Sequence, residues 1–371
     1  MSRYRTDVFR VAMSGPGDVS GVLALCQSGA LDPERIVAIL GKTEGNGGVN
    51  DFTREYSCAA LAAALAPLLA ITPAEVDRRI AMVMSGGTEG VLTPHATIFA
   101  RVPLVDDAPP ATEERLAIGI ATTPDFAPWE IGRRAQIQQT AQAVRSAMRD
   151  GGIERIEDVH WVQIKCPLLT AERVRTAQAA GHDVCTESAY KSMGYSRGAS
   201  ALGVALALGE IDGEIADDAV LTDWSLASRV ASSSAGIELN HNVVIVLGNS
   251  RAAAGDYVIG HDVMRDAIDA RAILSALRGA GLGTAADPLD FDPGRIANVL
   301  AKADPSPDGL VRGFRHTMLD DTDISATRHA RAAVGGIIAG LAGCPAIFVS
   351  GGAEHQGPPG GGPIAVIARV A

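Results

Sequence analysis

Residues 83–90 read VMSGGTEG, and related strings recur at 232–239 (SSSAGIEL) and 349–357 (VSGGAEHQG). Written from the serine, the three copies share the form S-[GA]-G-x-E, and they begin at Ser85, Ser234 and Ser350. Two of them follow the apolar runs RIAMVM and PAIFVS, which are typical of β-strands. A pattern that returns three times indicates that the chain is built from internal repeats.

The same residue types precede each copy in the same order. Each repeat first has a lysine that closes an apolar run, at Lys42, Lys165 and Lys302. Each then has a [ST]-R pair that enters an Ala-rich stretch typical of a buried helix, at Arg54, Arg197 and Arg328. The gaps between these residues are unequal, so the sequence predicts diverged repeats with different loops rather than a solenoid of fixed period.

Two polar linkers divide the chain, VDDAPPATEE at 105–114 and GNSRAAAGDY at 248–257. A stretch that looks helical, HDVMRDAIDARAILSALRGAGLG, follows the second linker. We therefore predict three repeat units, covering residues 1–105, 106–253 and 254–371. Their strands and helices give an α/β fold, with the units around a pseudo-threefold axis. We expect the strands to form a central barrel-like core with the helices outside.

Composition narrows the possible partners and the compartment. A net charge of −11 and a pI near 5.2 argue against nucleic acid or an anionic membrane as partner. The five cysteines contain no C-x-x-C pair, which favours reduced thiols in a cytoplasmic protein over disulfides or a zinc site. The first residues, MSRYRTDVFRVAM, lack the apolar core of a signal peptide, and AAVGGIIAGLAG is too short to cross a bilayer.

Two cofactor classes are disfavoured by the motifs. GKTEGNGGVND, at 41–51, looks like a phosphate-binding loop, but the Walker pattern needs a glycine where Ile36 stands. The eight histidines show no H-E-x-x-H or H-x-H clustering, which argues against a catalytic zinc. We therefore expect no catalytic cofactor, and Lys42 needs another role.

Each repeat instead carries a serine, a lysine and an arginine, which together suit acyl chemistry. A lysine whose pKa is lowered by burial or by a nearby cation can deprotonate a serine, and Ser-Lys pairs are an established alternative to Ser-His-Asp. Small residues after the serine let a carbonyl oxygen approach backbone N–H groups, and arginine can clamp carbonyl oxygens. Three such sets around one axis would fit a small, flat, roughly threefold ligand with outward carbonyls, such as a cyclic imide.

Several long motifs resemble the cyanuric acid hydrolase and barbiturase family of ring-opening amidohydrolases. They are GKTEGNGGVNDFTREY, VMSGGTEGVLTPH, VQIKCPLLT, KSMGYSRGASALG, SSAGIELNHNVV and VSGGAEHQGPPGGGP, and they span nearly the whole chain. RHTMLDDTDISATRHARA brings the chain closer to the cyanuric acid hydrolases. The resemblance implies three similar units around a central substrate, a homotetramer, and a reacting Ser-Lys dyad in the second unit.

Carried over by position, the dyad makes Ser234 the nucleophile and Lys165 its activator. Ser233 is a rival for the nucleophile, although the S-[GA]-G-x-E register favours Ser234. The oxyanion would be held by backbone N–H groups around Ala235 and Gly236.

The remaining positions of the repeats would hold the substrate. The resemblance places the clamping arginines at Arg54, Arg197 and Arg328, with Arg331 as a rival for the third. The other substrate carbonyls would be bound by the remaining serines and the glycines after them, with the remaining lysines as their partners: Ser85, Gly86, Ser350, Gly351, Lys42 and Lys302.

The resemblance also implies a structural divalent metal near the C-terminal Gly/Pro loop. Asp304 stands where the family usually carries a glutamate. The other donors would be Ala353, Gln356, Gly357, Pro358 and Gly361. Oxygen-only ligation suits Mg²⁺ or Ca²⁺. The alternative is that this loop is only a rigid turn beside the site.

The expected reaction is hydrolytic ring opening of cyanuric acid to carboxybiuret, which loses CO₂ to give biuret. The nearest alternative is a barbiturase, which opens barbituric acid to ureidomalonate with the same dyad. A non-catalytic ring-binding protein is a second alternative, but it would be expected to have lost a lysine or serine, and all three sets are intact. A nucleotide-dependent enzyme is disfavoured by Ile36.

Overall fold

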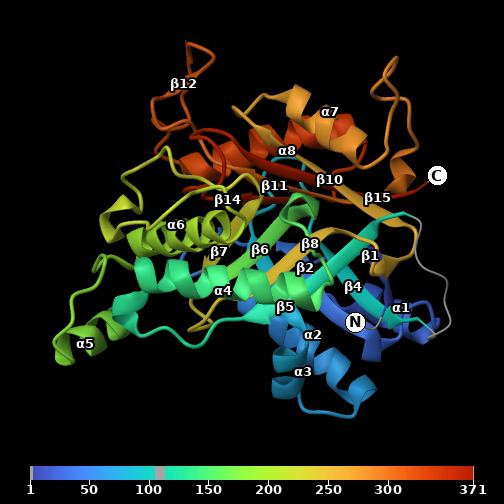
Figure 1. Ribbon diagram of the computed structural model, residues 1–371, viewed down its shortest axis with the longest axis horizontal. Coiled ribbons are helices and arrows are strands. Elements are labelled where there is room, and N and C mark those ends of the chain that lie inside the picture. Colours follow the sequence, from blue (N-terminus) through green and yellow to red (C-terminus); the bar gives the residue numbers. More distant parts are fainter. Residues whose placement is uncertain (1–2, 105–112, 371) are drawn as a thin grey trace.

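The computed structural model describes residues 3–104 and 113–370. Three sheets form its framework, two of four strands and one of four strands extended by a short fifth (Figure 1). The first contains β1 (Tyr4–Ala12), β2 (Ile36–Thr43), β3 (Ala81–Gly86) and β4 (His95–Pro103). The second contains β5 (Arg115–Thr122), β6 (Val159–Pro167), β7 (Ala231–Gly236) and β8 (Val243–Ser250). The third contains β10 (Tyr257–Met264), β11 (Ile296–Ala303), β14 (Phe348–Gly351) and β15 (Gly362–Arg369).

The three sheets have the same topology. Their strand orders are β1-β4-β2-β3, β5-β8-β6-β7 and β10-β15-β11-β14. In each, the second and third strands along the chain are parallel, and the fourth is antiparallel to the first and second. Each second strand also has a register shift near its start, next to Ile36, Val159 and Ile296. The sequence repeats are therefore structural repeats.

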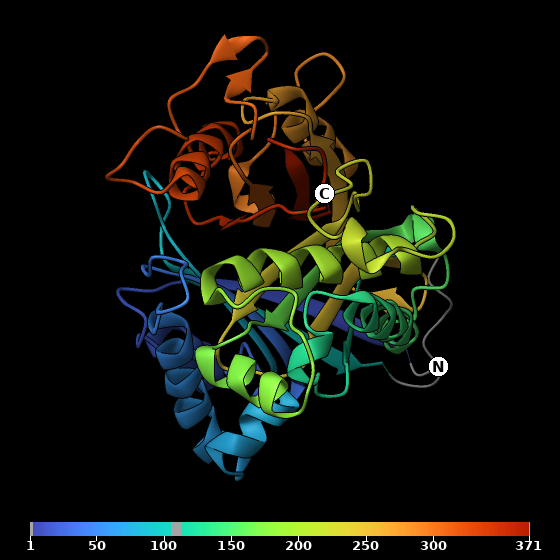
Figure 2. The same ribbon diagram turned by 90° about the vertical axis from the view of Figure 1, so that its left-hand side faces the viewer.

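The helices lie outside the sheets, as Figures 1 and 2 show. They are α1 (Ser20–Gln27), α2 (Thr53–Leu69), α3 (Pro73–Arg79), α4 (Arg134–Asp150), α5 (Ala171–Ala179), α6 (Ala189–Ala207), α7 (Ala270–Gly279) and α8 (Ala326–Ala342). The long helices α2, α6 and α8 are the three Ala-rich stretches that the sequence predicted to be helical. A small hairpin, β12 (Leu310–Val311) and β13 (Phe314–Arg315), projects beyond α8.

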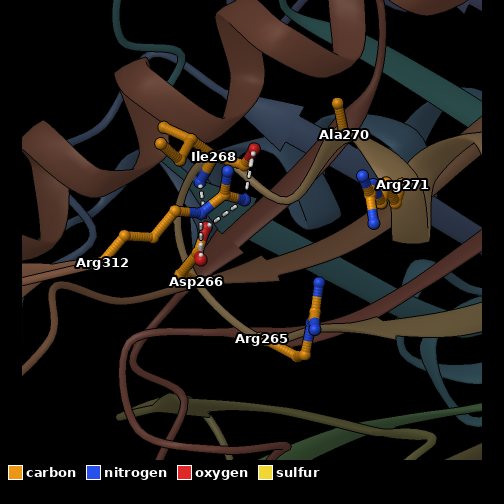
Figure 3. A pocket seen from close by; sticks show the side chains of 6 residues that line it. All are labelled: Arg265, Asp266, Ile268, Ala270, Arg271 and Arg312. Atoms are coloured by element: carbon orange, nitrogen blue, oxygen red, sulfur yellow. Dashed lines mark hydrogen bonds and ion pairs between the residues drawn. The ribbon is translucent and has the colours of Figure 1, made fainter.

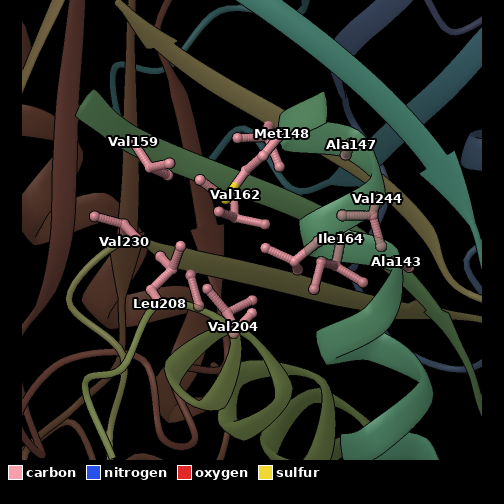
Figure 4. Packing of buried hydrophobic residues seen from close by; sticks show 14 of the residues in the cluster. Ala143, Ala147, Met148, Val159, Val162, Ile164, Val204, Leu208, Val230 and Val244 are labelled. Atoms are coloured by element: carbon pink, nitrogen blue, oxygen red, sulfur yellow. The ribbon is translucent and has the colours of Figure 1, made fainter. Parts of the chain in front are cut away.

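Alternation along each strand builds two kinds of core. In β6, Val162 and Ile164 point outward onto Val204 of α6 and its neighbours, forming the local core of the second unit (Figure 4). Trp161, which directly precedes Val162 on the strand, points to the opposite face. The first and third sheets have matching outer cores against their own helices. Each sheet is thus apolar on both faces.

The inner faces meet in one shared apolar centre. It contains Val8, Ala38, Leu40, Val83 and Phe99 from the first sheet, Leu116, Ile118, Trp161, Ile245 and Leu247 from the second, and Ile259, Leu300, Phe348, Ala365 and Ile367 from the third. Among the described residues the sheets are separate hydrogen-bonded units and do not close into one barrel. The α/β repeat fold is as predicted, but its central core is three sheets packed by side chains.

Two details differ from the sequence analysis or bear on it. The stretch predicted as helical after residue 260 begins as strand β10, because Tyr257–Met264 pairs with β15, and its helix α7 starts only at Ala270. The unit boundary predicted at 105/106 lies outside the described residues. The boundary predicted near 254 falls at β9 (Ala253–Ala254), which adds to the first sheet beside β1. The exact unit limits stay a prediction.

No single helix in the described part of the chain is long and apolar enough to cross a membrane. Only α2 and α3 together pass that test, and they are bent by 99° at their break. Within the fold, α2 packs Leu61, Leu65 and Leu69 into the outer core of the first sheet.

A buried polar contact joins the first and third sheets. His95, at the start of β4, contacts the carbonyl oxygen of Thr93 through Nδ1 (2.8 Å) and Asn298 Nδ2 of β11 through Nε2 (3.2 Å). This arrangement suits a neutral imidazole that donates from Nδ1 and accepts at Nε2. Burial lowers the pKa of His95 from 6.5 to about 4.

We expect this histidine to make stability depend on pH. Above pH 6.5 neither the folded nor the unfolded form of His95 is protonated, so it has no effect. As the pH falls from 6.5 to about 4, His95 binds a proton in the unfolded state but not in the folded state. The free energy of unfolding therefore drops by about 3 kcal/mol. Urea unfolding of the wild type and of His95→Gln at pH 7 and pH 4 tests this. The variant should lose less stability on acidification, and an equal loss would contradict the prediction.

Candidate active site

The three lysines and three serines of the repeats are brought together at one end of the shared core. Strand pairing sets Lys42 opposite Ser85, Lys165 opposite Ser234, and Lys302 opposite Ser350. Paired residues on neighbouring strands face the same side of a sheet. In the first sheet they follow Leu40 and Val83, two positions earlier on the same inner face. We call these six residues the Lys–Ser centre.

The same pairing separates the two candidate nucleophiles. Ser233 lies opposite Ile164, whose side chain belongs to the outer core of the second unit. Its neighbour Ser234 therefore faces the Lys–Ser centre, and Ser233 faces the helices. The geometry favours the register that the repeat pattern suggested.

Burial makes the lysines of the centre unusual. The chain has four lysines, and the three in the centre are 0–3% exposed, whereas Lys191 is exposed. Burial and the nearby Arg331 lower the pKa of Lys42 well below its ordinary value. Burial and Arg197 lower the pKa of Lys302 to about 7. These two amines are thus driven toward the neutral form that a base requires.

Two of the three Lys–Ser pairs are hydrogen-bonded and the third is not. Lys42 Nζ donates to Ser85 Oγ (3.1 Å), and Lys302 Nζ donates to Ser350 Oγ (3.3 Å). Lys165 Nζ instead donates to the carbonyl oxygen of Met84 (3.1 Å) and forms an ion pair with Glu238 (2.8 Å).

Ser234 Oγ is buried and has no hydrogen-bond partner within residues 3–104 and 113–370. The residue is 8% exposed, compared with 4% for Ser85 and 1% for Ser350. The pair predicted to react is therefore the one whose contacts differ from those of the other two.

The centre is shared between sheets rather than contained in any one. Lys165 of the second sheet reaches Met84 in the first, and Lys302 of the third reaches the carbonyl oxygen of Ser233 in the second (2.9 Å). Ser85 Oγ and Ser350 Oγ, from the first and third sheets, lie 3.5 Å apart. A ligand at this point would contact all three units at once.

The arginines of the repeats also reach into the next unit. Arg197 on α6 forms a two-pronged ion pair with Glu354 (2.8 and 2.5 Å). Arg331 on α8 makes the same pair with Glu89 (2.8 and 2.6 Å), and Arg328 adds one contact to Glu89 (3.0 Å).

The two candidates for the third arginine differ in burial. The side chain of Arg331 is 5% exposed and that of Arg328 is 41% exposed. Arg331 therefore occupies the position equivalent to Arg197. In the first unit, Arg54 donates to the carbonyl oxygens of Ala235 (3.1 Å) and Gly48 (2.9 Å).

Sequence reasoning gave no role to the glutamate that ends each S-[GA]-G-x-E copy. The structure shows all three, Glu89, Glu238 and Glu354, as partly buried partners of a cation. The signal was present in the motif itself, because the glutamate was its last shared residue. Its partner could not be read from the sequence, because it comes from another unit or from a strand 73 residues away.

The same arginines explain why the third residue of the motif is glycine. Gly87 and Gly352 have positive φ angles of 107° and 74°, which favour glycine. A Cβ at Gly87 would meet the Arg331 guanidinium, and one at Gly352 would meet that of Arg197. The arginines can lie flat against the chain only because these positions lack a side chain.

The small residues after the serines contact cations through their carbonyl oxygens. Gly86 O accepts from Lys42 (3.2 Å), Gly351 O accepts from Lys302 (2.9 Å), and Ala235 O accepts from Arg54. Their predicted role as N–H donors to substrate stays a prediction.

A cavity of about 740 Å³ lies beside the centre. Its lining includes Arg197, Arg331, Gly351 and Gly352 on the inner side, and Tyr190 with the loop 321–325 farther out. It has room for a small flat ligand and a path to solvent.

A second hollow of about 590 Å³ lies at the start of α7 (Figure 3). Arg312 there donates two hydrogen bonds to the Asp266 carboxylate (2.8 and 3.2 Å), and Arg265 forms an ion pair with Asp269 (2.9 Å). None of the repeat arginines lines this hollow, whereas Arg197, Arg328 and Arg331 line the cavity beside the Lys–Ser centre. The cavity beside the Lys–Ser centre is therefore the candidate active site.

The predicted metal loop lies next to this site. Asp304 accepts from the Thr327 hydroxyl (3.1 Å) and from the backbone N–H of Ala353 (3.3 Å), so the carboxylate does reach the loop. Burial and the neighbouring Glu354 raise the pKa of Asp304 to about 6. No cluster of three or more His, Cys, Asp or Glu ligands occurs in the described residues.

The other predicted donors belong to one tight loop. The side-chain amide of Gln356 already makes hydrogen bonds within the protein. Its Oε1 accepts from the backbone N–H of Ser233 (2.7 Å), and its Nε2 donates to Gly352 O (3.1 Å). Gly357 donates its N–H to Ser228 O, and Gly361 donates its N–H to Pro358 O (both 2.9 Å). One carboxylate beside backbone oxygens is a donor set whose chemistry fits a hard cation.

Comparison with known proteins places this arrangement in a family. The family model described as amidohydrolase ring-opening protein matches residues 7–369. A cyanuric acid amidohydrolase of Bradyrhizobium diazoefficiens is 63% identical over 98% of both chains, and one of Pseudomonas sp. (strain ADP) is 56% identical over 99% of both.

Solved structures agree with this comparison. A cyanuric acid hydrolase structure, described as arising by structural concatenation, superimposes with a TM-score of 0.93 at 56% identity, over 99% of this chain and 100% of the other. The hydrolase from A. caulinodans gives a TM-score of 0.89 at 48% identity, over 99% of both chains. The chain therefore belongs to the family of ring-opening amidohydrolases.

Proposed function

We propose that this protein hydrolyses cyanuric acid by opening its ring, giving carboxybiuret that decarboxylates to biuret. The observation that carries the proposal is the Lys–Ser centre: three near-equivalent Lys–Ser pairs converge on one point. Three outward carbonyls on a flat ring match three such subsites. The names of the relatives and the solved structure described above support the same substrate.

In the proposed reaction, Ser234 Oγ attacks a ring carbonyl carbon while the Lys165 amine takes the hydroxyl proton. Backbone N–H groups of Ala235 and Gly236 hold the resulting oxyanion. The C–N bond breaks as Lys165 returns the proton to the leaving nitrogen. Water then attacks the acyl-enzyme, with Lys165 again accepting the proton, and releases carboxybiuret and free Ser234. Because Lys165 starts on Glu238, it must turn to Ser234 as a neutral amine.

The other two units hold the substrate. Ser85 with Lys42, and Ser350 with Lys302, would donate to the two carbonyls that do not react. Arg54, Arg197 and Arg331 surround them as clamps. Because the serines of these units are already hydrogen-bonded to their lysines, they are ordered before substrate arrives.

We propose that a structural Mg²⁺ or Ca²⁺ is held by Asp304 and backbone oxygens of residues 353–361. It would offset the negative charge that Asp304 and Glu354 place side by side and would stiffen the loop beside Ser350. The cytoplasmic location and the homotetramer expected from the sequence also stay proposals. Light scattering on the purified protein tests the latter.

The deciding experiment is to add purified protein separately to cyanuric acid and to barbituric acid and follow the loss of each ring's ultraviolet absorbance. Loss of cyanuric acid alone is the expected result. Loss of barbituric acid alone would move the substrate to a pyrimidine-trione and keep the centre. No loss of either would overturn the catalytic proposal.

A further inference from the structure

The glutamates that end the three motifs do not all have the same kind of partner. Glu89 and Glu354 are each held by an arginine of the preceding unit, Arg331 and Arg197. Glu238 has Arg54 as the corresponding neighbour, but no hydrogen bond or ion pair joins the two in the described structure. Arg54 Nε has no partner there at all.

Glu238 turns back into its own unit instead. A Cβ at Gly236 would collide with the Glu238 carboxylate, so the side chain folds over that glycine. At the equivalent positions, Gly87 and Gly352, the colliding group is an arginine from another unit. In this position Glu238 contacts Lys165 Nζ at 2.8 Å.

The contact between Glu238 and Lys165 affects the hydrogen bonding of Ser234. Lys42 and Lys302 each donate to the serine opposite them, which fixes the Ser85 and Ser350 hydroxyls. Lys165 instead contacts the Glu238 carboxylate and the carbonyl oxygen of Met84. Ser234 Oγ has no hydrogen-bond partner among the described residues. We infer that Glu238 is the positioning residue that selects the second unit for chemistry, by holding Lys165 off Ser234 and leaving that hydroxyl free to attack.

This inference rests on the proposed function and adds the reason why one of three similar pairs would react. A serine whose lone pairs already accept an N–H is a weaker nucleophile toward a carbonyl, and it is oriented as a donor to substrate. A free hydroxyl with an amine in reach can turn toward the carbonyl carbon. An adjacent carboxylate favours the ammonium form of an amine, so removing the charge of Glu238 should make Lys165 easier to deprotonate.

Several titratable and charged groups of the described residues lie around Lys165. Glu238 follows β7, Arg54 and Cys58 lie on α2, and Cys166 is the next residue on β6. Burial opposes the charge of Glu238, but Lys165 and Arg54 outweigh it and lower the pKa of Glu238 to about 2. Burial raises the pKa of both thiols, so they stay neutral at working pH. Glu238 is therefore the negative group that acts on the amine.

The test is Glu238→Gln, which keeps size and hydrogen-bonding capacity but removes the charge. We expect the acid limb of the kcat/KM profile for cyanuric acid to move down by roughly 1–3 pH units. KM should change little, because Glu238 does not clamp substrate. Glu89→Gln is the matched control: it frees Arg331, so it should raise KM and leave the limb in place. An unmoved limb in Glu238→Gln, or an equal shift in Glu89→Gln, would overturn the inference.

A second measurement needs no substrate. Because the chain has only four lysines, lysine labelled with ¹³C at Cε gives four NMR signals, and a Lys191→Arg variant identifies the exposed one. In Glu238→Gln the Lys165 signal should titrate at lower pH than in the wild type, while the other signals stay in place. An unchanged Lys165 signal would overturn the inference. If the wild type left cyanuric acid intact, the proposed function would fail, and these spectra would still decide the role of Glu238.

Discussion

Replacing Ser234 with alanine should lower kcat for cyanuric acid by a factor on the order of 10³ or more. The change removes the nucleophile and leaves the rest of the Lys–Ser centre in place. Ser234 Oγ makes no hydrogen bond in the described structure, so its loss strands no buried partner and should not unfold the protein. Steady-state kinetics on cyanuric acid, with a melting curve as the folding check, measures the effect.

Two other serines serve as controls. Ser85→Ala removes one donor to a carbonyl that does not react, and should cost about tenfold or less. Ser233→Ala changes a side chain that faces the outer core, and should keep kcat within a small factor. A large loss in Ser233→Ala with normal turnover in Ser234→Ala would reverse the assignment.

Replacing Arg331 with alanine should lower kcat/KM by a factor on the order of 10²–10³, which corresponds to about 3–4 kcal/mol. Arg331 is 5% exposed on its side chain and makes a two-pronged pair with Glu89 beside the Lys–Ser centre. Its removal takes away a clamp and also leaves Glu89 as a buried carboxylate with a single exposed partner, Arg328. KM should rise more than kcat falls.

The neighbouring arginine provides the comparison. Arg328→Ala removes a side chain that is 41% exposed and makes one contact to Glu89, so the loss should stay within about tenfold. The two variants differ by one helical turn and remove the same charge. If Arg328→Ala were the more damaging of the two, Arg328 would be the clamp, as the [ST]-R pattern of the repeats first indicated.

The sequence was sufficient for the repeats and for the residues that meet in the centre. Lys42, Lys165 and Lys302 could be found because each closes an apolar run near the end of a strand, opposite a serine of a recurring motif. Strand β7 gave no apolar signal, because its sequence ASSSAG turns serines, not large apolar side chains, toward the centre. Its place could be inferred only from the other two copies.

Contacts between units lay beyond the sequence. The partners of Glu89 and Glu354 come from residues 242 and 157 positions away, and no local pattern specifies them. The choice between Arg328 and Arg331 depends on which face of α8 is buried, and both lie near the start of that helix. The sequence also could not say whether the barrel-like core is closed, since strand patterns show which faces are apolar but not whether sheet edges join by hydrogen bonds or by side-chain packing.

The head-to-tail arginine–glutamate pairs also bear on how such a chain could have arisen. Each unit supplies a buried cation to one neighbour or a buried carboxylate to another, and one unit alone would keep these charges without partners. An ancestral single unit could therefore have been stable only as a trimer of identical chains. Fusion of three copies would remove the need to assemble and would allow the copies to diverge, so that one glutamate could turn from its neighbour's arginine to its own lysine. Asymmetry of that kind is open to a fused chain and closed to a symmetric trimer.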